Sequence, residues 1–122
     1  ALLLAVLQQR ARVAVQTQDV YASTVGGVRL VEPGLDLAIC LAIVSAINDR
    51  PLPSDLVAFG EVGLGGEVRQ VANAPRRLSE AARLGFTRVI APRTSPAPDD
   101  DALKMVRVST LPEALRAAGL IG

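Results

Sequence analysis

The stretch "FGEVGLGGEVRQVANAPRRLSEAARLGFTRVIAP", residues 59–92, decides the fold of this 122-residue chain. Its first half passes through a glycine-rich turn at 63–66 into a strand at 67–71. An apolar strand at 56–59 precedes the turn. Because a short glycine turn between two strands is typical of a hairpin, residues 56–71 are predicted to form a β-hairpin or a bulged return.

The second half of the stretch predicts a helix followed by a strand. Asn73 stands at the position of a helix N-cap, Pro75 suits the first turn, and Gly85 ends the helix. The apolar face of this helix consists of Leu78, Ala81 and Ala82. Residues 88–91 are then predicted to be a short strand.

Upstream, residues 36–48 are apolar at nearly every position, which predicts a central helix that is covered on all sides. An amphipathic helix is expected at 1–12, and strands are expected at 19–25 and 28–31 on either side of a Gly-Gly break. Because the chain opens without Met and inside a helical pattern, we expect it to be a fragment of a longer protein.

Downstream, residues 92–101 hold three prolines and three aspartates, which predicts a solvated loop. A last strand is expected at 106–108. Thr110 and Glu113 then form the pattern of a capping box, and Gly119 ends the terminal helix. Strands and helices alternate, so the predicted fold class is mixed α/β around a partly parallel sheet, in one domain spanning residues 1–122.

Composition excludes several classes of function. There is no histidine, which removes Ser-His-Asp and Cys-His catalysis and most zinc sites. The single cysteine, Cys40, excludes an internal disulfide and fits a reducing cytoplasm; we interpret it as a small core residue. The net charge of +1 provides no global attraction to nucleic acid or membrane. The longest apolar runs are too short to span a bilayer.

Residues 59–92, together with "EPGLDLAICLAIVSAINDRPLP" at 32–53, resemble the proteolytic domain of the Lon-type ATP-dependent proteases. More closely, residues 18–71 resemble the C-terminal Lon-like domain of the RadA (Sms) family of bacterial DNA repair ATPases. The motifs that carry this resemblance are Val25-Gly26-Gly27, Glu32-Pro33, Asp36-Leu37-Ala38, Arg50-Pro51-Leu52-Pro53 and Gly60-Glu61. The resemblance implies a Lon proteolytic-domain-like fold, a ribosomal-protein-type βαβ sandwich of mixed sheet and helices.

The resemblance also implies that this domain is not an enzyme. The serine position of Lon-type peptidases falls on Gly34 and the lysine position on Pro75, so neither nucleophile nor base is present there. The single lysine, Lys104, lies outside both motifs. A cryptic Ser-Lys peptidase stays open as an alternative, as does a purely structural interaction module. We interpret Glu61 and Glu67, which flank the glycine turn, as structural rather than catalytic.

Arginine is concentrated at 69–93, where six arginines and one acidic residue give a local charge of +5. Such a density can contact phosphates. The residues predicted to bind DNA are Arg69, Arg76, Arg77, Arg83 and Arg88. The alternatives are a solvated helix face or salt bridges between subunits.

For the whole protein the family resemblance implies a hexameric, RecA-like ATPase with a zinc finger that acts as an ATP-dependent branch-migration helicase. ATP, magnesium and zinc are then expected outside this domain, which itself takes no cofactor. The expected partners are further copies in a homo-hexameric ring, single-stranded or branched DNA and a RecA-type recombinase, with no membrane, in the cytoplasm. The role expected for this domain is to support the ring and to present a basic surface to DNA.

Overall fold

The computed structural model describes residues 33–122. The elements in chain order are η1 (Pro33–Leu35), α3 (Asp36–Asn48), β1 (Leu56–Ala58), β2 (Glu61–Val62), β3 (Val68–Arg69), α4 (Ala74–Arg83), β4 (Arg88–Pro92), β5 (Lys104–Val108) and α5 (Leu111–Ala117). The elements predicted at 1–12, 19–25 and 28–31 lie outside the described residues.

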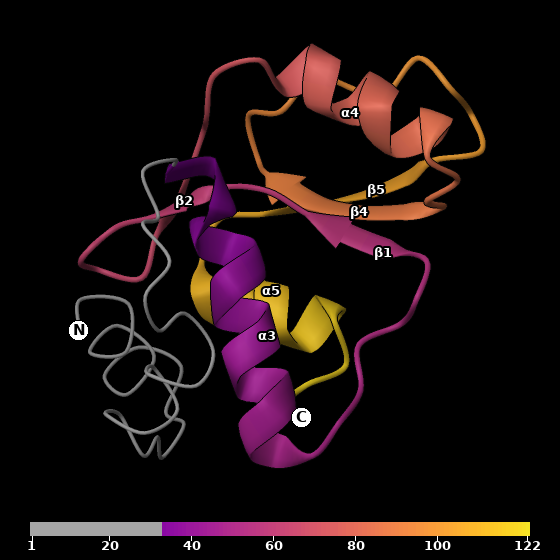
Figure 1. Cartoon of the computed structure of the whole chain (residues 1–122). Coiled ribbons are helices and arrows are strands. Elements are labelled where there is room, and N and C mark those ends of the chain that lie inside the picture. The colour runs from indigo at the N-terminus through magenta and orange to yellow at the C-terminus, as the bar shows by residue number, and fades with distance from the viewer. Residues whose placement is uncertain (1–32) are drawn as a thin grey trace, which may run out of the picture.

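Three layers build the fold (Figure 1). The middle layer is a parallel sheet in the order β1-β4-β5, with α4 on one face and α3 and α5 on the other. Side chains of β4 alternate between the two faces, as a strand requires. Val89 and Ala91 pack with α4, and Ile90 packs with α3 and α5. The expectation of a mixed α/β fold with a partly parallel sheet is confirmed.

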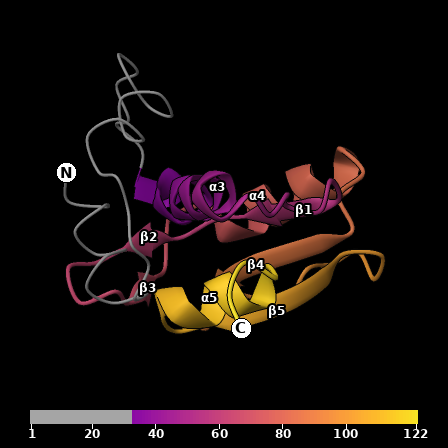
Figure 2. The same cartoon turned by 90° about the horizontal axis from the view of Figure 1, so that it is seen from below.

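The prediction that residues 56–71 form one hairpin is wrong for the first strand. β1 pairs in parallel with β4, from Leu56 opposite Arg88 onward. The antiparallel hairpin consists of β2 and β3 alone, and Figure 2 shows it beside the start of α3 rather than in the main sheet. Gly60 separates the two: its φ of 155° and its approach to Val68, where a Cβ would lie 2.9 Å from Cγ1, let the chain leave the sheet.

Helix α3 begins and ends at the predicted residues. Its buried side chains include Leu37 and Ile43, whereas Ala42 and Ala46 are exposed. The prediction that this helix is covered on all sides is therefore wrong, because the sheet and α5 cover one side and small alanines form the other. Asp49, in the left-handed conformation with φ 50°, ends the helix.

The helices α4 and α5 begin in different ways. Asn73 occupies the N-cap position of α4, but its φ is 63° and its side chain caps nothing, so the predicted cap is wrong. At α5, the Thr110 side chain accepts a hydrogen bond from the Glu113 backbone N–H, which confirms the predicted cap. The positive φ values of Gly85 and Gly119 confirm both predicted helix ends. Within residues 33–122, every helix is too short or too polar to cross a membrane.

Candidate functional site

An open groove of about 240 Å³ lies between η1, β1 and α4. The helix contributes a stripe at i, i+3, i+4 and i+7, which is the spacing of one helical face. The residues that line the groove are Gly34, Leu35, Val57, Ala58, Phe59, Arg77, Glu80, Ala81, Leu84 and Phe86. Apart from Arg77 and Glu80, these residues are apolar or glycine, so the groove is an apolar surface with charge on one rim.

Both positions of the Lon-type dyad belong to elements beside this groove. Gly34 is buried in its wall, where its carbonyl oxygen accepts a hydrogen bond from the Gly60 N–H (3.1 Å). The Leu37 N–H at the start of α3 donates in turn to the Gly60 carbonyl oxygen (3.0 Å). Pro75 lies exposed in the first turn of α4. Among the described residues that line the groove there is no hydroxyl, thiol, imidazole or amine side chain. Lys104 lies on β5, and β4 separates that strand from β1.

Helix α3 also carries a carboxylic acid, Asp36, and a thiol, Cys40. The Asp36 carboxylate accepts a hydrogen bond from the Val62 N–H (3.1 Å) and so links α3 to β2. Burial raises the pKa of Asp36 against the lowering effect of that hydrogen bond, and the neighbouring charge of Glu61 raises it further. Burial also raises the pKa of Cys40 to about 12, so its thiol stays protonated and inert at neutral pH.

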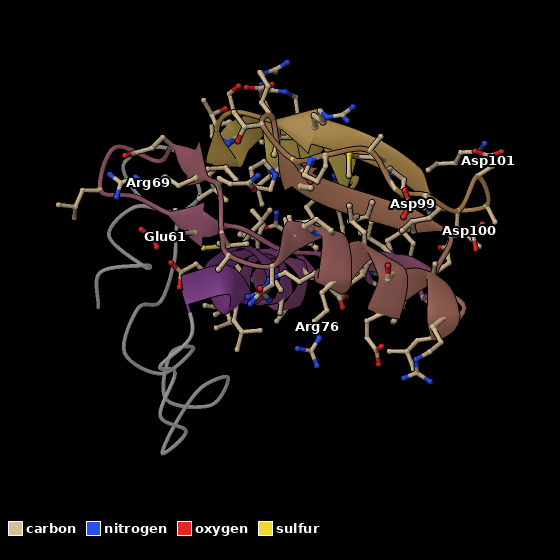
Figure 3. The ribbon with its side chains drawn as sticks, turned by 90° about the horizontal axis from the view of Figure 1, so that it is seen from above. Glu61, Arg69, Arg76, Asp99, Asp100 and Asp101 are labelled. Atoms are coloured by element: carbon tan, nitrogen blue, oxygen red, sulfur yellow. The ribbon has the colours of Figure 1, made fainter. Side chains whose placement is uncertain are left out.

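The arginines predicted to bind DNA separate into three places, the first of which is the β2–β3 hairpin (Figure 3). Arg69 on β3 lies 3.4 Å from Glu61 and 2.5 Å from Glu67. The hydrogen bond to Glu67 raises the pKa of Arg69. The Glu67 pKa is lowered by a hydrogen bond from its own backbone N–H and by Arg69.

The second place is the amino end of β4. Arg88 binds the Asp55 carboxylate with both Nε (2.9 Å) and Nη2 (2.8 Å), and Thr87 Oγ1 donates to the same carboxylate (2.5 Å). These hydrogen bonds, that of Arg88 first, hold the pKa of Asp55 well below its usual range. Arg88 thus forms a bidentate ion pair with Asp55 of its own chain.

Helix α4 is the third place and holds Arg76, Arg77 and Arg83. Arg83 forms an ion pair with Glu80 one turn earlier, which lowers the pKa of Glu80. Arg77 donates from Nε to the Ala72 carbonyl oxygen (3.0 Å). Arg76 is exposed, makes no hydrogen bond or ion pair within residues 33–122, and points away from the helix toward solvent in Figure 3.

The sequence count of +5 at 69–93 overstates the charge that these arginines present. Asp55, Glu61 and Glu67 precede the stretch in the chain and Glu113 follows it, yet each forms an ion pair with one of its arginines. Including these four carboxylates lowers the net charge of the group from +5 to +1. The sequence gives no sign of these ion pairs, because they depend on the parallel register of β1 and β4 and on the pairing of β2 with β3 in the hairpin.

No group of three or more potential metal ligands (His, Cys, Asp or Glu) occurs in the part of the chain that the structure describes. The acidic residues Asp99, Asp100 and Asp101 lie on the loop between β4 and β5 (Figure 3).

The profile of a family described as "ChlI: Subunit ChlI of Mg-chelatase" matches residues 26–95, more than half of the chain. The chain belongs to the ChlI family. The matched part of this ChlI-type domain includes η1, β1 and α4, which line the groove, and all five candidate arginines.

Individual relatives of this ChlI-type domain carry the name "DNA repair protein RadA". The chain is 47% identical to that of Mycobacterium tuberculosis H37Rv over 116 residues and to that of Escherichia coli K12 over 116 residues. It is 53% identical to that of Mycolicibacterium smegmatis over 92 residues. These matches cover 95%, 94% and 75% of the chain but 24%, 25% and 20% of the relatives. The expected resemblance to the RadA family is confirmed, and the chain spans about a quarter of the length of most of these relatives.

Proposed function

We propose that this ChlI-type domain is a non-catalytic module of a RadA-type DNA repair ATPase, which supports assembly of a ring of subunits and contacts DNA. The observation that carries the proposal is the identity of 47% over nearly the whole chain to proteins named DNA repair protein RadA. ATP hydrolysis, branch migration, zinc binding and a recombinase partner belong, in this proposal, to the longer protein in the cytoplasm.

The non-catalytic part of the proposal is supported by the dyad positions. Ser-Lys peptide hydrolysis requires a nucleophile and a base within hydrogen-bond reach of each other. Gly34 and Pro75 provide neither, and Cys40 is buried with a raised pKa. The groove between them is apolar, which suits packing against another surface better than chemistry.

The DNA contact is assigned first to Arg76 at the start of α4. Arg76 is exposed and makes no ion pair within the described residues, so it can approach a phosphate without breaking an existing contact. Arg69, Arg83 and Arg88 are each held by a carboxylate, so we expect them to contribute less. A basic surface repeated on each subunit of a ring would add avidity.

The test measures binding of a fluorescein-labelled single-stranded oligonucleotide by anisotropy over a range of salt concentrations. Arg76→Glu is expected to weaken binding and to reduce the slope of log K against log salt by roughly 0.7, because about 0.7 counterions are released per phosphate contact. The matched control is Arg116→Glu, which makes the same charge change per residue on α5, across the sheet from α4.

An unchanged affinity and an unchanged salt slope in the α4 variant would refute the DNA contact. Equal losses in the α4 and Arg116 variants would show that net charge alone is being measured. The ion pairs that hold Arg69, Arg83 and Arg88 favour a second candidate function, a purely structural interaction module, and either of these results would support it.

A further inference from the structure

Three of the four large exposed hydrophobic side chains in the described part of the chain lie on two surfaces, a groove and a hairpin turn. In residues 33–122 the large exposed hydrophobic side chains are Leu35 (41% exposed), Leu64 (67%), Leu84 (59%) and Val106 (46%). Leu35 and Leu84 line the groove between η1, β1 and α4, whereas Leu64 lies in the turn of the β2–β3 hairpin. Apolar side chains that collect on a groove and on a protruding turn indicate contact with another surface.

The hairpin holds Leu64 outward on a rigid support. Within the turn, the Gly63 N–H donates to the Glu67 carbonyl oxygen (2.9 Å), and the Gly65 N–H donates to the Glu67 side chain (2.9 Å). The hairpin is joined to the rest of the fold by the Val68 N–H, which donates to the Ser109 carbonyl oxygen (2.9 Å). A side chain on such a support loses little conformational entropy when it is buried by a partner.

Leu64 is not among the residues that line the groove of its own chain. In Figure 1 the hairpin turn projects to the left of the molecule, away from α4, which forms one wall of the groove. A contact between the two apolar surfaces therefore requires two copies of the chain.

The charges beside the two surfaces are opposite in sign. The hairpin carries Glu61, Glu67 and Arg69, with a net charge of −1. The exposed side of α4 carries Arg76, Glu80 and Arg83, with a net charge of +1. Opposite potentials favour the approach of a hairpin to a groove and disfavour the approach of two hairpins or two grooves.

We infer that the Leu64 hairpin of one copy docks into the groove of a second copy, against Leu35 and Leu84. This contact is heterologous, because it joins different surfaces of identical chains, so each added copy leaves one hairpin and one groove available for the next. The inference rests on the assembly role proposed above and names the two surfaces that would perform it.

The first experiment follows the solution mass of the 122-residue chain by light scattering from low to high concentration. The wild-type mass is expected to rise with concentration. Leu64→Ala and Leu84→Ala are each expected to raise the dissociation constant roughly tenfold or more, as truncation of a central apolar contact does. Val106→Ala on β5 is the matched control, since it shortens an exposed apolar side chain outside both surfaces, and its dissociation constant is expected to stay unchanged.

The second experiment identifies the contact by disulfide trapping. A mixture of the Leu64→Cys and Leu84→Cys variants is expected to form a cross-linked dimer on mild oxidation, and a mixture of Leu64→Cys with Val106→Cys is expected to form none. Cys40 does not interfere, because it is fully buried.

The outcomes separate this inference from the proposed function. Wild-type assembly that Leu64→Ala leaves unchanged would overturn the hairpin contact while the assembly role stands. A monomer at every concentration would overturn both, and the DNA contact would then be judged from the anisotropy measurement alone. A disulfide within one chain of a Leu64→Cys, Leu84→Cys double variant, without dimer, would also overturn the inference.

Discussion

Arg88 illustrates how the fold changes the meaning of a single residue. In the sequence it adds one positive charge to an arginine-rich stretch. In the structure its Nε and Nη2 both donate hydrogen bonds to the Asp55 carboxylate. The pairing joins the residue before β1 to the first residue of β4, so it fixes the start of the parallel register. The same contact that lowers its value for DNA binding gives it a structural role.

Asp55 makes stability depend on pH in a direction that can be worked out. Its folded pKa lies below its usual value of 3.8, so the folded state binds this proton less readily than the unfolded chain does. The contribution is present above about pH 4 and is lost as pH falls through the lower folded value. We expect Asp55→Asn to lower Tm at pH 7, and the difference from wild type to shrink below about pH 4.

Thermal unfolding followed by circular dichroism at pH 7 and at several acidic values checks this expectation. Asp101→Asn, on the exposed loop before β5, is the control and should follow the wild type throughout. A Tm difference for Asp55→Asn that stays constant over the whole range would show that the pair with Arg88 is not what the substitution removes.

Individual site residues were predicted unevenly. The absence of a serine at Gly34 and of a lysine at Pro75 could be read directly from the resemblance to Lon-type peptidases, because each is one position in a long motif. The partners of the arginines could not be predicted, because they are set by long-range contacts: Arg88 and Asp55 are 33 positions apart, and Arg93 and Glu113 are 20 apart. A local charge count cannot include such partners.

Among the elements, α5 shows a helix whose start depends on one side chain. Thr110 accepts from the Glu113 N–H, and its hydroxyl also donates to the Glu113 carboxylate (3.2 Å). Thr110→Ala removes both contacts and is expected to lower the free energy of unfolding by about 1 kcal/mol, the usual effect of losing an N-cap. Thr110→Ser keeps the hydroxyl and should stay within a few tenths of a kcal/mol of the wild type in urea unfolding; equal losses in the two variants would contradict the cap.

The elements that the sequence predicted well are those whose limits are set by local chemistry. Helix α3 ends at Asp49, and α4 and α5 end near Gly85 and Gly119, each in a left-handed conformation that a local turn requires. The strand pairing was predicted less well. Nothing in residues 56–71 indicates that β1 leaves the hairpin and pairs with β4 instead, because the partner of Leu56 is Arg88, which lies outside that stretch.

For the whole molecule, the core depends on its last residues. Leu115 is fully buried in the cluster that also contains Leu37, Ile43 and Ile90. Leu115→Ala is expected to lower the free energy of unfolding by about 2–5 kcal/mol, because it leaves a cavity in a packed core. Leu64→Ala, at a leucine that is 67% exposed, should change it by less than about 0.5 kcal/mol.

Urea unfolding of the two variants at a concentration where the chain is monomeric makes the comparison. A small effect of Leu115→Ala would mean that α5 is not part of the cooperative core. The same measurement shows that Leu64→Ala is properly folded, so a loss of self-association in that variant can be assigned to its surface.

The parallel pairing of β1 with β4 and of β4 with β5 has a consequence for synthesis of the protein. Leu56 pairs with Arg88, which is 32 positions later in the chain, and Arg88 pairs with Lys104. The sheet therefore cannot form while the ribosome is still synthesising α4. Leu115 and Leu120, both almost fully buried, come later still. Since nonlocal contacts form slowly, this domain should fold as one unit only after its final helix has been made. A ribosome that stalls before α5 would hold a chain whose apolar core is open to chaperones and proteases.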